Sequence, residues 1–231
     1  MTAQPVIIRI DGAHTVSGLL QVPDRAVACL VLAHGAGAGM THRFMAAVAD
    51  GLQTRGVATL RFQFPYMETG SKRPDRPALA HATVRAAVET AQRMVPGLPL
   101  FAGGKSFGAR MTSQAQAEAP LPGVGGLVFL GFPLHPAGKP SEERAAHLTE
   151  VRVPMLFLQG TRDALAETRR LVPVAAALGA GSTVKLIQHA DHSFHVPVRS
   201  GQTDDKVLSA VLDDTVLWIR RVVDHRPETT T

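Results

Sequence analysis

The five residues Gly104-Lys105-Ser106-Phe107-Gly108 place a serine between two glycines with the spacing Gly-x-Ser-x-Gly. The apolar run at 98–102 before them predicts a short buried strand, and residues 109–119 after them predict a helix. A serine in such a turn forms a nucleophile elbow, because the strained backbone exposes the hydroxyl and the glycines keep other side chains away. Ser106 is therefore the candidate nucleophile, with a helix N-cap as the plainer interpretation.

Two further residues could activate this serine. A serine hydroxyl is a weak nucleophile at neutral pH, so an imidazole must take its proton, and a carboxylate must orient that imidazole. Asp163 follows a predicted strand at 153–159, and His192 follows another at 183–187. In an open parallel sheet these strand ends meet where ligands bind. The order along the chain, serine, acid and then histidine, is typical of an α/β-hydrolase triad.

Other residues compete for the same roles. His189 and His195 lie close to His192, which we rank first because Asp-His-Ser-Phe closes the loop after the last predicted strand. Asp163 could instead be the N-cap of its helix. Asp191 is a second acidic candidate, although a neighbour in sequence cannot easily reach the same imidazole nitrogen. The ordered set of three is favoured because it is less expected by chance than any single member.

Acyl transfer also needs donors for a developing oxyanion, and one such donor contributes about 2.7–4 kcal/mol. The backbone N–H of Phe107, directly after the serine, is one candidate. The other is expected in the glycine-rich loop 34–39, at Ala36, because glycine on either side lets the backbone approach a substrate closely. We expect His34 to shape this loop, whereas His135 either lines the site or caps a turn.

Strand and helix patterns alternate from residue 27 onward, which predicts a mostly parallel sheet with helices on both faces. Two strands around Asp11-Gly12 predict an N-terminal antiparallel hairpin. The stretch between Gly131 and Pro154 is too short for a large lid, so we expect one α/β domain over 1–231 with an open site and a tail that frays from about residue 225. The expected strands are 6–10, 15–22, 27–33, 57–62, 98–102, 126–131, 153–159 and 183–187. The expected helices are 44–54, 79–95, 109–119, 141–149, 165–178 and 204–223. Ser141 is the expected N-cap of the helix at 141–149, and a long loop is expected at 65–77.

The composition describes an ordinary globular chain. Its 231 residues are 45% hydrophobic and 19% charged. The formal net charge of +5 raises the question of nucleic acid, but the basic residues are scattered. The densest basic cluster, Lys72, Arg73 and Arg76, has no interleaved aromatic residues, so we predict no nucleic-acid partner. This cluster could favour an anionic substrate, although a solvated loop is the plainer interpretation.

The single cysteine, Cys29, lies in an apolar run and is expected to be a small buried hydrophobe. One cysteine excludes a disulfide within the chain, which fits a reducing cytoplasm. The N-terminal residues lack the basic and apolar regions of a signal peptide, and no apolar run approaches the roughly 18 residues of a membrane span. We therefore predict a cytoplasmic protein without a membrane partner, a metal or a cofactor; the sequence makes no prediction of oligomeric state.

Two glycine-rich loops invite a comparison with phosphate-binding motifs. Gly103-Gly104-Lys105-Ser106 resembles the end of a P-loop, but that motif needs glycine at position 99, where this chain has Pro99. Gly35-Ala36-Gly37 begins like a dinucleotide fingerprint, whose third glycine would fall at Met40. Both alternatives fail on spacing.

Five motifs in order resemble the predicted α/β-hydrolases related to testis-expressed protein 30, a group that is itself similar to dienelactone hydrolases. The resemblance runs from about residue 27 to the last helix, and it implies an α/β-hydrolase fold with the triad Ser106, Asp163 and His192 and with backbone donors near Ala36 and Phe107. The family often has Met after the serine and Gly two places later, where this chain has Phe107 and Ala109, which alters the pocket wall. Dienelactone hydrolases carry a cysteine nucleophile that this chain lacks, so their substrate is not transferred. The motifs occupy 34–38, 103–110, 132–140, 159–163 and 191–194.

These observations predict a serine hydrolase that cleaves a small ester or thioester through an acyl-enzyme. A different class stays open, namely a protein-interaction module with a hydrolase fold and an unused or vestigial site, because an intact triad can be idle.

Overall fold

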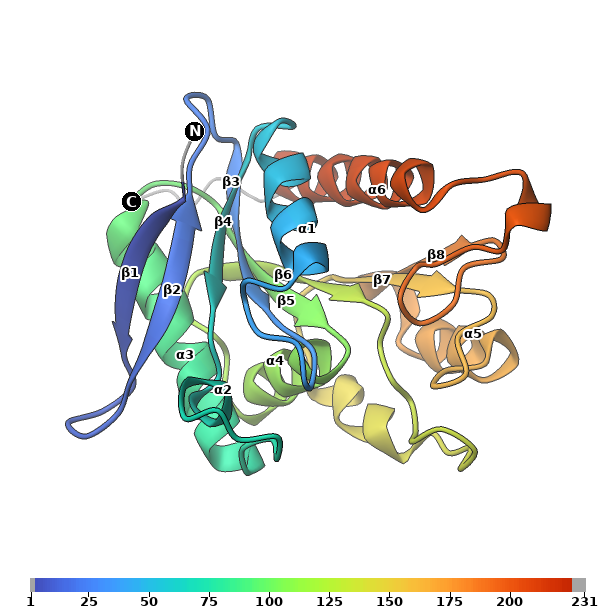
Figure 1. Cartoon of the computed structure of the whole chain (residues 1–231), viewed down its shortest axis with the longest axis horizontal. Helices are drawn as coiled ribbons and strands as arrows, with labels where there is room; N and C mark the ends of the chain where they lie inside the picture. The colour runs from blue at the N-terminus through green and yellow to red at the C-terminus, as the bar shows by residue number, and fades with distance from the viewer. Residues whose placement is uncertain (1–2, 226–231) are drawn as a thin grey trace.

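The computed structural model describes residues 3–225 and contains an eight-stranded sheet with the order β1-β2-β4-β3-β5-β6-β7-β8 (Figure 1). Strands β3 to β8 are parallel, whereas β1 pairs antiparallel with β2 and β2 antiparallel with β4. The predicted mostly parallel sheet with an N-terminal hairpin is confirmed. The strands are β1 Gln4–Arg9, β2 Thr15–Gln21, β3 Ala28–Ala33, β4 Val57–Phe62, β5 Leu100–Lys105, β6 Val124–Leu130, β7 Met155–Gly160 and β8 Ser182–Ile187.

Helices cover both faces of the sheet. In Figure 1, α1 and α6 lie on one face, and α3, α4 and α5 lie on the other. The helices are α1 Arg43–Gln53, α2 Pro65–Glu68, α3 Pro77–Met94, α4 Phe107–Glu118, α5 Thr168–Ala177 and α6 Asp204–Asp224, and short 3-10 helices occur at η1 Glu143–Glu150, η2 Gly179–Gly181 and η3 Val198–Ser200.

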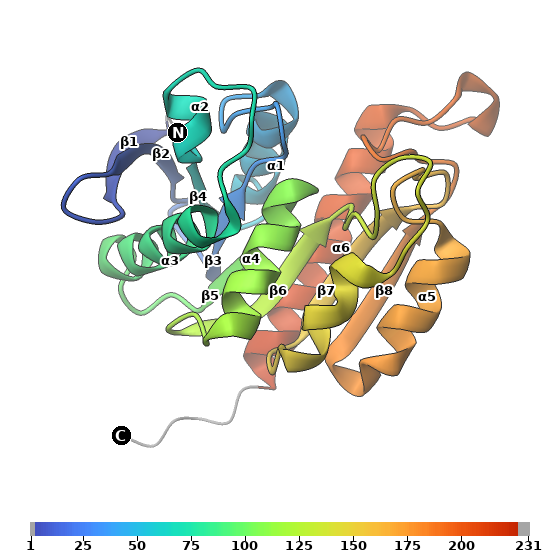
Figure 2. The same ribbon diagram turned by 90° about the horizontal axis from the view of Figure 1, so that it is seen from below.

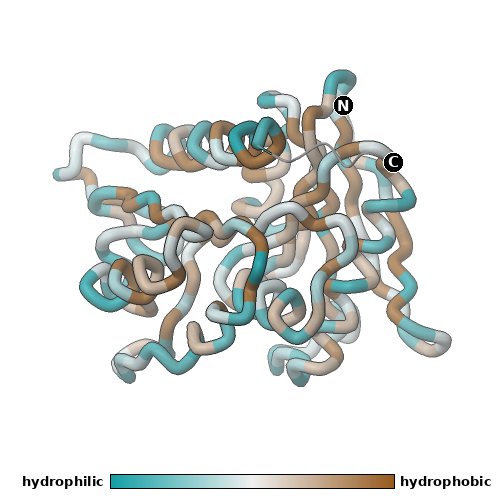
Figure 3. The backbone as a smooth tube through the Cα atoms, turned by 180° about the vertical axis from the view of Figure 1, so that it is seen from behind, coloured by the Kyte–Doolittle hydropathy of each residue, from teal (hydrophilic) through white to brown (hydrophobic). Residues whose placement is uncertain are grey.

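Each face of the sheet has its own apolar core, because side chains alternate between the two faces along a strand. On β3, Cys29 and Val31 belong to the core under α3 and α4, whereas Leu30 and Leu32 belong to the core under α1 and α6. All residues of β3 are therefore buried, as the unbroken apolar run predicts. Figure 3 shows apolar and polar positions alternating around α6, which turns its apolar side to the sheet.

The structure differs from the expected elements in several places, of which four bear on the fold around the site. The expected loop at 65–77 contains the short helix α2, which begins with proline at its first position. The expected helix at 141–149 is the 3-10 helix η1; its N-cap is Glu142, and the Ser141 hydroxyl accepts the Glu143 N–H at 3.1 Å. Strand β5 continues beyond the expected end at 102 to Lys105, and α5 begins at Thr168 rather than 165.

The segment between β6 and β7 contains only η1 and its flanking loops, so the expected absence of a large lid is confirmed for the described residues. Within residues 3–225, no helix combines the length and the apolar character that crossing a membrane requires. The single domain, the cytoplasmic location and the absence of a nucleic-acid partner stay predictions. Most of the tail that is expected to fray lies outside the described residues.

Candidate active site

Ser106 occupies the single position between β5 and α4, at the carboxyl edge of the sheet. Figure 2 labels the two elements that this residue joins. Its φ of 52° and ψ of −109° lie outside the ordinary regions for a residue with a side chain, a strain of about 1–3 kcal/mol. The turn needs the two glycines around it. A Cβ on Gly104 would lie 2.3 Å from the Ala33 carbonyl oxygen, and one on Gly108 would lie 2.5 Å from the same atom. The motif therefore lets α4 begin directly against the end of β3.

The three predicted side chains form one continuous line. The distance from Ser106 Oγ to His192 Nε2 is 2.8 Å, and the distance from His192 Nδ1 to Asp163 Oδ2 is 2.6 Å. A carboxylate only accepts hydrogen bonds, so Nδ1 carries a proton and donates it to Asp163. Nε2 of the neutral ring is then an acceptor for the serine hydroxyl. The geometry holds the imidazole in the tautomer that general-base chemistry requires.

Asp163 is held by two donors besides His192. Its side chain is completely buried, and the Gln159 Nε2 amide donates to Oδ2 at 2.5 Å while the Leu165 N–H donates to Oδ1 at 2.8 Å. Gln159 in turn accepts the Phe132 N–H through its Oε1 at 3.0 Å. A buried carboxylate needs such partners to offset lost hydration. Asp163 is not the N-cap of α5, since that position is Glu167.

The loop that carries His192 is shaped by Asp191. One carboxylate oxygen of Asp191 accepts the Ser193 N–H at 2.7 Å and the His195 N–H at 3.0 Å. The competing histidines have other partners: His195 pairs with Asp204, which raises the pKa of His195, and the backbone N–H of His189 donates to Thr161 Oγ1 at 2.9 Å. The structure thus brings His192, and neither neighbour, to Ser106.

Lys105 connects the elbow to this loop. Its Nζ donates to the His192 backbone carbonyl at 2.6 Å and lies 5.6 Å from the centre of the Phe194 ring. Part of the side chain remains accessible to solvent, but the ammonium itself is surrounded by protein atoms. This burial lowers the pKa of Lys105 to about 8, against the opposing charges of Asp163 and Asp191. The residue before the nucleophile therefore fixes the backbone of the histidine.

The loop at 34–40 lies beside the serine. A Cβ on Gly35 would lie 3.8 Å from Ser106 Cβ. His34 is buried and pins the loop: its Nδ1 donates to the Gly35 carbonyl at 2.8 Å, and its Nε2 accepts the Phe64 N–H at 3.0 Å. Burial lowers the pKa of His34, which keeps the ring neutral for these two bonds. The expectation that His34 shapes the loop is confirmed.

The two expected oxyanion donors are available. Within residues 3–225, neither the Ala36 N–H nor the Phe107 N–H donates to another protein group. Phe107 is the first residue of α4, so its N–H also lies at the positive end of the helix dipole. Next to Ala36, the Gly37 N–H donates to the Tyr66 hydroxyl at 3.2 Å, which holds the loop from the other side. The role of these two N–H groups as oxyanion donors stays a prediction.

Other candidates lie away from this line. His135 is buried and contacts Glu167 Oε2 at 2.9 Å and the Pro136 carbonyl at 2.8 Å, so it ties a turn to α5. The side chains of Lys72, Arg73 and Arg76 are exposed. Arg73 and Arg76 line a surface hollow of about 440 Å³ near α2.

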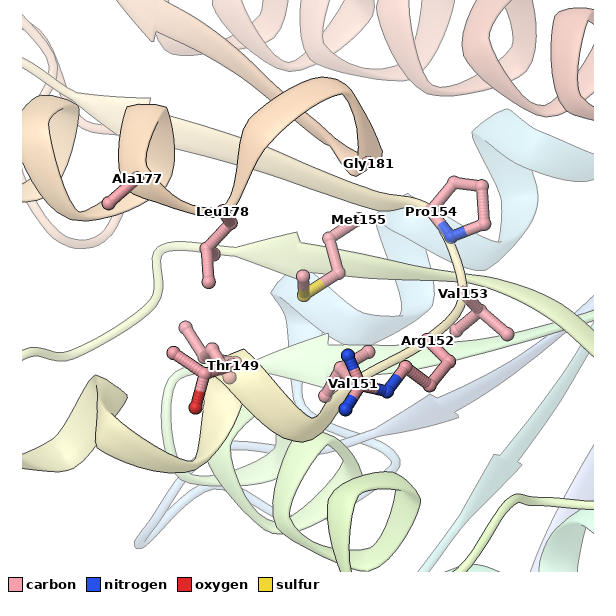
Figure 4. A pocket seen from close by; sticks show the side chains of 10 residues that line it. Thr149, Val151, Arg152, Val153, Pro154, Met155, Ala177, Leu178 and Gly181 are labelled. Carbon is pink, nitrogen blue, oxygen red and sulfur yellow. The ribbon is translucent and has the colours of Figure 1, made fainter.

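A second hollow, of about 310 Å³, lies where β7 begins, at the opposite edge of the sheet from Ser106 (Figure 4). It is lined by Met155, Leu178 and other residues from the ends of η1 and α5. The triad side chains line neither hollow. The chemistry of the site is therefore defined by its hydrogen bonds and not by either hollow.

Comparison with known proteins agrees with this fold. Residues 26–220 match the α/β-hydrolase domain family, and the chain belongs to that family. The fold is shared with an α/β serine hydrolase homologue from Coxiella burnetii (18% identity, TM-score 0.74, 93% of this chain and 98% of that one). It is also similar to dienelactone hydrolase from Anabaena variabilis (21% identity, TM-score 0.71, 96% of this chain and 99% of that one). A third similar structure is the esterase domain of a Rhodothermus marinus protein (17% identity, TM-score 0.72, 96% of this chain and 99% of that one). The likeness to proteins related to testis-expressed protein 30 stays a prediction.

Sequence reasoning missed the parts that Lys105 and Gln159 play. Both stand inside the quoted motifs, but which way their side chains point depends on elements far away in sequence. One signal was available for Lys105, because a lysine that ends an otherwise apolar strand beside a candidate nucleophile is unusual.

Proposed function

We propose that this protein is a serine hydrolase that cleaves a small carboxylic ester or thioester. The observation that carries the proposal is the unbroken line from Ser106 Oγ through the His192 ring to the buried Asp163 carboxylate. Structural ion pairs also occur in folded proteins, but they do not require a serine with a strained backbone at a strand end.

In the proposed reaction, Ser106 Oγ attacks the acyl carbon as His192 Nε2 takes its proton. His192 then gives this proton to the leaving oxygen or sulfur, and an acyl-enzyme remains. A water molecule loses a proton to the same Nε2, attacks the acyl carbon and releases the acid. Asp163 keeps the ring orientation and stabilises the imidazolium at each stage.

The backbone N–H groups of Ala36 and Phe107 would bind the oxyanion of each tetrahedral intermediate. Both are main-chain donors, one in a loop held by hydrogen bonds and one at the start of a helix, so they need no reorganisation when charge develops. A neighbouring structure is named as an esterase domain, which supports an ester as the substrate class. The dienelactone hydrolase similarity supports the fold and not the substrate, because this chain places serine at the elbow and buries its one cysteine.

The test is the variant Ser106→Ala, assayed on 4-nitrophenyl acetate and with a fluorophosphonate probe. We expect the wild-type protein to hydrolyse the ester and to react covalently with the probe, and we expect both reactions to be lost in the variant. Ser200→Ala, in the short helix η3, is the matched control and should keep both reactions. Full turnover or labelling in Ser106→Ala would overturn the assignment. A wild-type protein that never reacts with the probe would instead favour the vestigial interaction module.

A further inference from the structure

In the described part of the chain, α4 and η1 each carry an arginine without an acidic partner. Arg110 is on α4, one turn after Ser106. Its backbone N–H donates to the Ser106 carbonyl at 3.1 Å. Arg144 is on η1, which runs beside α4 in both Figure 1 and Figure 2. Within residues 3–225, neither guanidinium forms a hydrogen bond or an ion pair with another group. Glu142, which precedes η1, pairs with Arg170, and Glu118 on α4 pairs with His81.

One hydrogen bond fixes the relation between the two helices. Ser113 Oγ and His147 Nε2 are 2.8 Å apart. Arg110 precedes Ser113 by three residues, and Arg144 precedes His147 by three residues. Both elements run from the carboxyl edge of the sheet towards its amino edge, because each leads to the start of the next parallel strand. Three residues rise about 4.5 Å in an α-helix and about 6 Å in a 3-10 helix, so both arginines lie about one turn closer to the carboxyl edge.

The electrostatics of this cluster favour an anion. Burial lowers the pKa of Arg110, and the positive charge of Arg144 lowers it further. Burial, helped by Arg110 and His81, lowers the pKa of His147 to about 4, so this ring is neutral. The Nε atom of Arg110 is buried without a hydrogen-bond partner. Like charges brought together in this way disfavour folding unless an anion binds between them.

The cluster lies close to the elbow along α4. A helical side chain leans towards the N-terminus of its helix, so Arg110 leans towards Ser106, about 6 Å of helix rise away. The His147 ring lies 6.4 Å from the Phe132 ring, and Phe132 follows Gly131, where a Cβ would be 3.5 Å from the His192 ring. These contacts connect the cluster to the surroundings of the His192 ring.

We propose that Arg110 and Arg144 bind an anionic terminal group of the substrate, a carboxylate or a phosphate, so that the preferred substrate is a short ester or thioester that carries a negative charge. The planar guanidinium matches the oxygens of either group. This inference rests on the proposed hydrolase function and adds the class of substrate to it.

The test compares kcat/KM for 4-nitrophenyl butyrate, which is neutral, with kcat/KM for mono-4-nitrophenyl glutarate, which ends in a carboxylate, at constant ionic strength. The wild-type protein should favour the charged ester, and the ratio of the two constants should fall at least tenfold in Arg110→Gln and in Arg144→Gln. Arg144→Lys keeps the charge but loses the planar fork, so its ratio should lie between these values. A ratio within twofold of the wild-type value in both glutamine variants would overturn the proposal.

Arg73→Gln is the matched control, because it removes an exposed arginine from the other basic cluster. Its ratio should equal that of the wild-type protein, and a tenfold fall there instead would move the anion to loop 72–76 and overturn the proposal. Inhibition of wild-type butyrate hydrolysis by propyl phosphate and by glutarate separates the two anions. Inhibition by one anion identifies the group that the arginines bind. Inhibition by neither refutes an anion site even where the glutamine variants do not fold.

Failure of the proposed function has a different signature. If the wild-type protein hydrolyses neither ester, the hydrolase proposal fails, and calorimetric titration with propyl phosphate and with glutarate tests the arginines alone. Binding of either anion to the wild-type protein that is lost in Arg110→Gln supports the site, and absence of binding overturns it.

Discussion

Replacing Lys105 by methionine removes the ammonium that holds the backbone of His192. Methionine is about as long as lysine and is apolar, so it fills the same space without leaving a large cavity. The His192 carbonyl then loses the donor that lies 2.6 Å away. A hydrogen bond from a charged donor contributes about 1.5–3 kcal/mol, and a barrier that is higher by about 1.4 kcal/mol corresponds to a tenfold slower reaction. We expect kcat to fall about 10- to 100-fold, while KM for a neutral ester changes less than about threefold because no substrate contact is removed.

The same substitution changes how stability depends on pH. Burial lowers the pKa of Lys105 in the folded state from 10.5 to about 8. Between these two values the unfolded chain keeps a proton that the folded chain has lost, so the free energy of unfolding of the wild-type protein rises with pH. This stabilisation is complete above about pH 10.5 and is lost as the pH falls through 8. One unit of pKa shift corresponds to about 1.36 kcal/mol, and the interval from pH 7.5 to pH 9.5 covers most of the range between the folded and unfolded pKa values. The free energy of unfolding therefore rises by about 2 kcal/mol over this interval.

The assay is urea unfolding of the wild-type protein and of Lys105→Met at pH 7.5 and at pH 9.5, together with kcat at each pH. The difference in unfolding free energy between the two proteins should move by about 2 kcal/mol in favour of the wild-type protein as the pH rises. Lys72→Met, at an exposed lysine, is the control and should give parallel profiles. Parallel profiles for Lys105→Met, with an unchanged kcat, would refute both the burial of the ammonium and its hold on His192.

Two further substitutions test the geometry of the site. Asp163→Asn keeps the shape of the side chain but presents an amide to Nδ1 of His192, and kcat on a neutral ester should fall about 10³- to 10⁴-fold with an unchanged circular dichroism spectrum; a fall below tenfold would contradict the role of Asp163. Gly131→Ala adds a Cβ 3.0 Å from Lys105 Nζ and 3.5 Å from the His192 ring, at a residue whose backbone φ is 72°. This substitution should lower kcat, and it should lower the melting temperature by about 3–6 °C in a thermal melt. A variant with wild-type kcat would show that the ring tolerates the contact.

Much of the fold could be predicted because the local signals agree with one another. Strand β4 at Val57–Phe62 has the predicted bounds, since Gly56 ends the preceding helix and the residues of the strand are all buried. The elbow was visible because glycine, serine and glycine are required by backbone geometry at fixed offsets. The order of the strand ends then placed Asp163 and His192 at the same edge as Ser106.

The parts that could not be predicted depend on contacts between distant elements. Whether residues 143–150 form an α-helix or a 3-10 helix is decided by packing, since Ala145 and Leu148 are the buried residues of this segment and lie three apart. The roles of Lys105 and Gln159 follow from the side of the strand on which each lies and from what faces it there. Arg110 and Arg144 are ordinary surface residues in the sequence, and they become a pair only through the register between two helices.

The burial of Cys29 has a practical use. Its side chain is fully enclosed, and burial raises the pKa of the thiol to about 12, so almost no thiolate exists at neutral pH. Maleimides and iodoacetamides should therefore leave the native protein unmodified. A cysteine engineered on the surface would accept a fluorophore or spin label at one defined place, without first removing the natural thiol, so that the movement of individual loops could be followed during turnover.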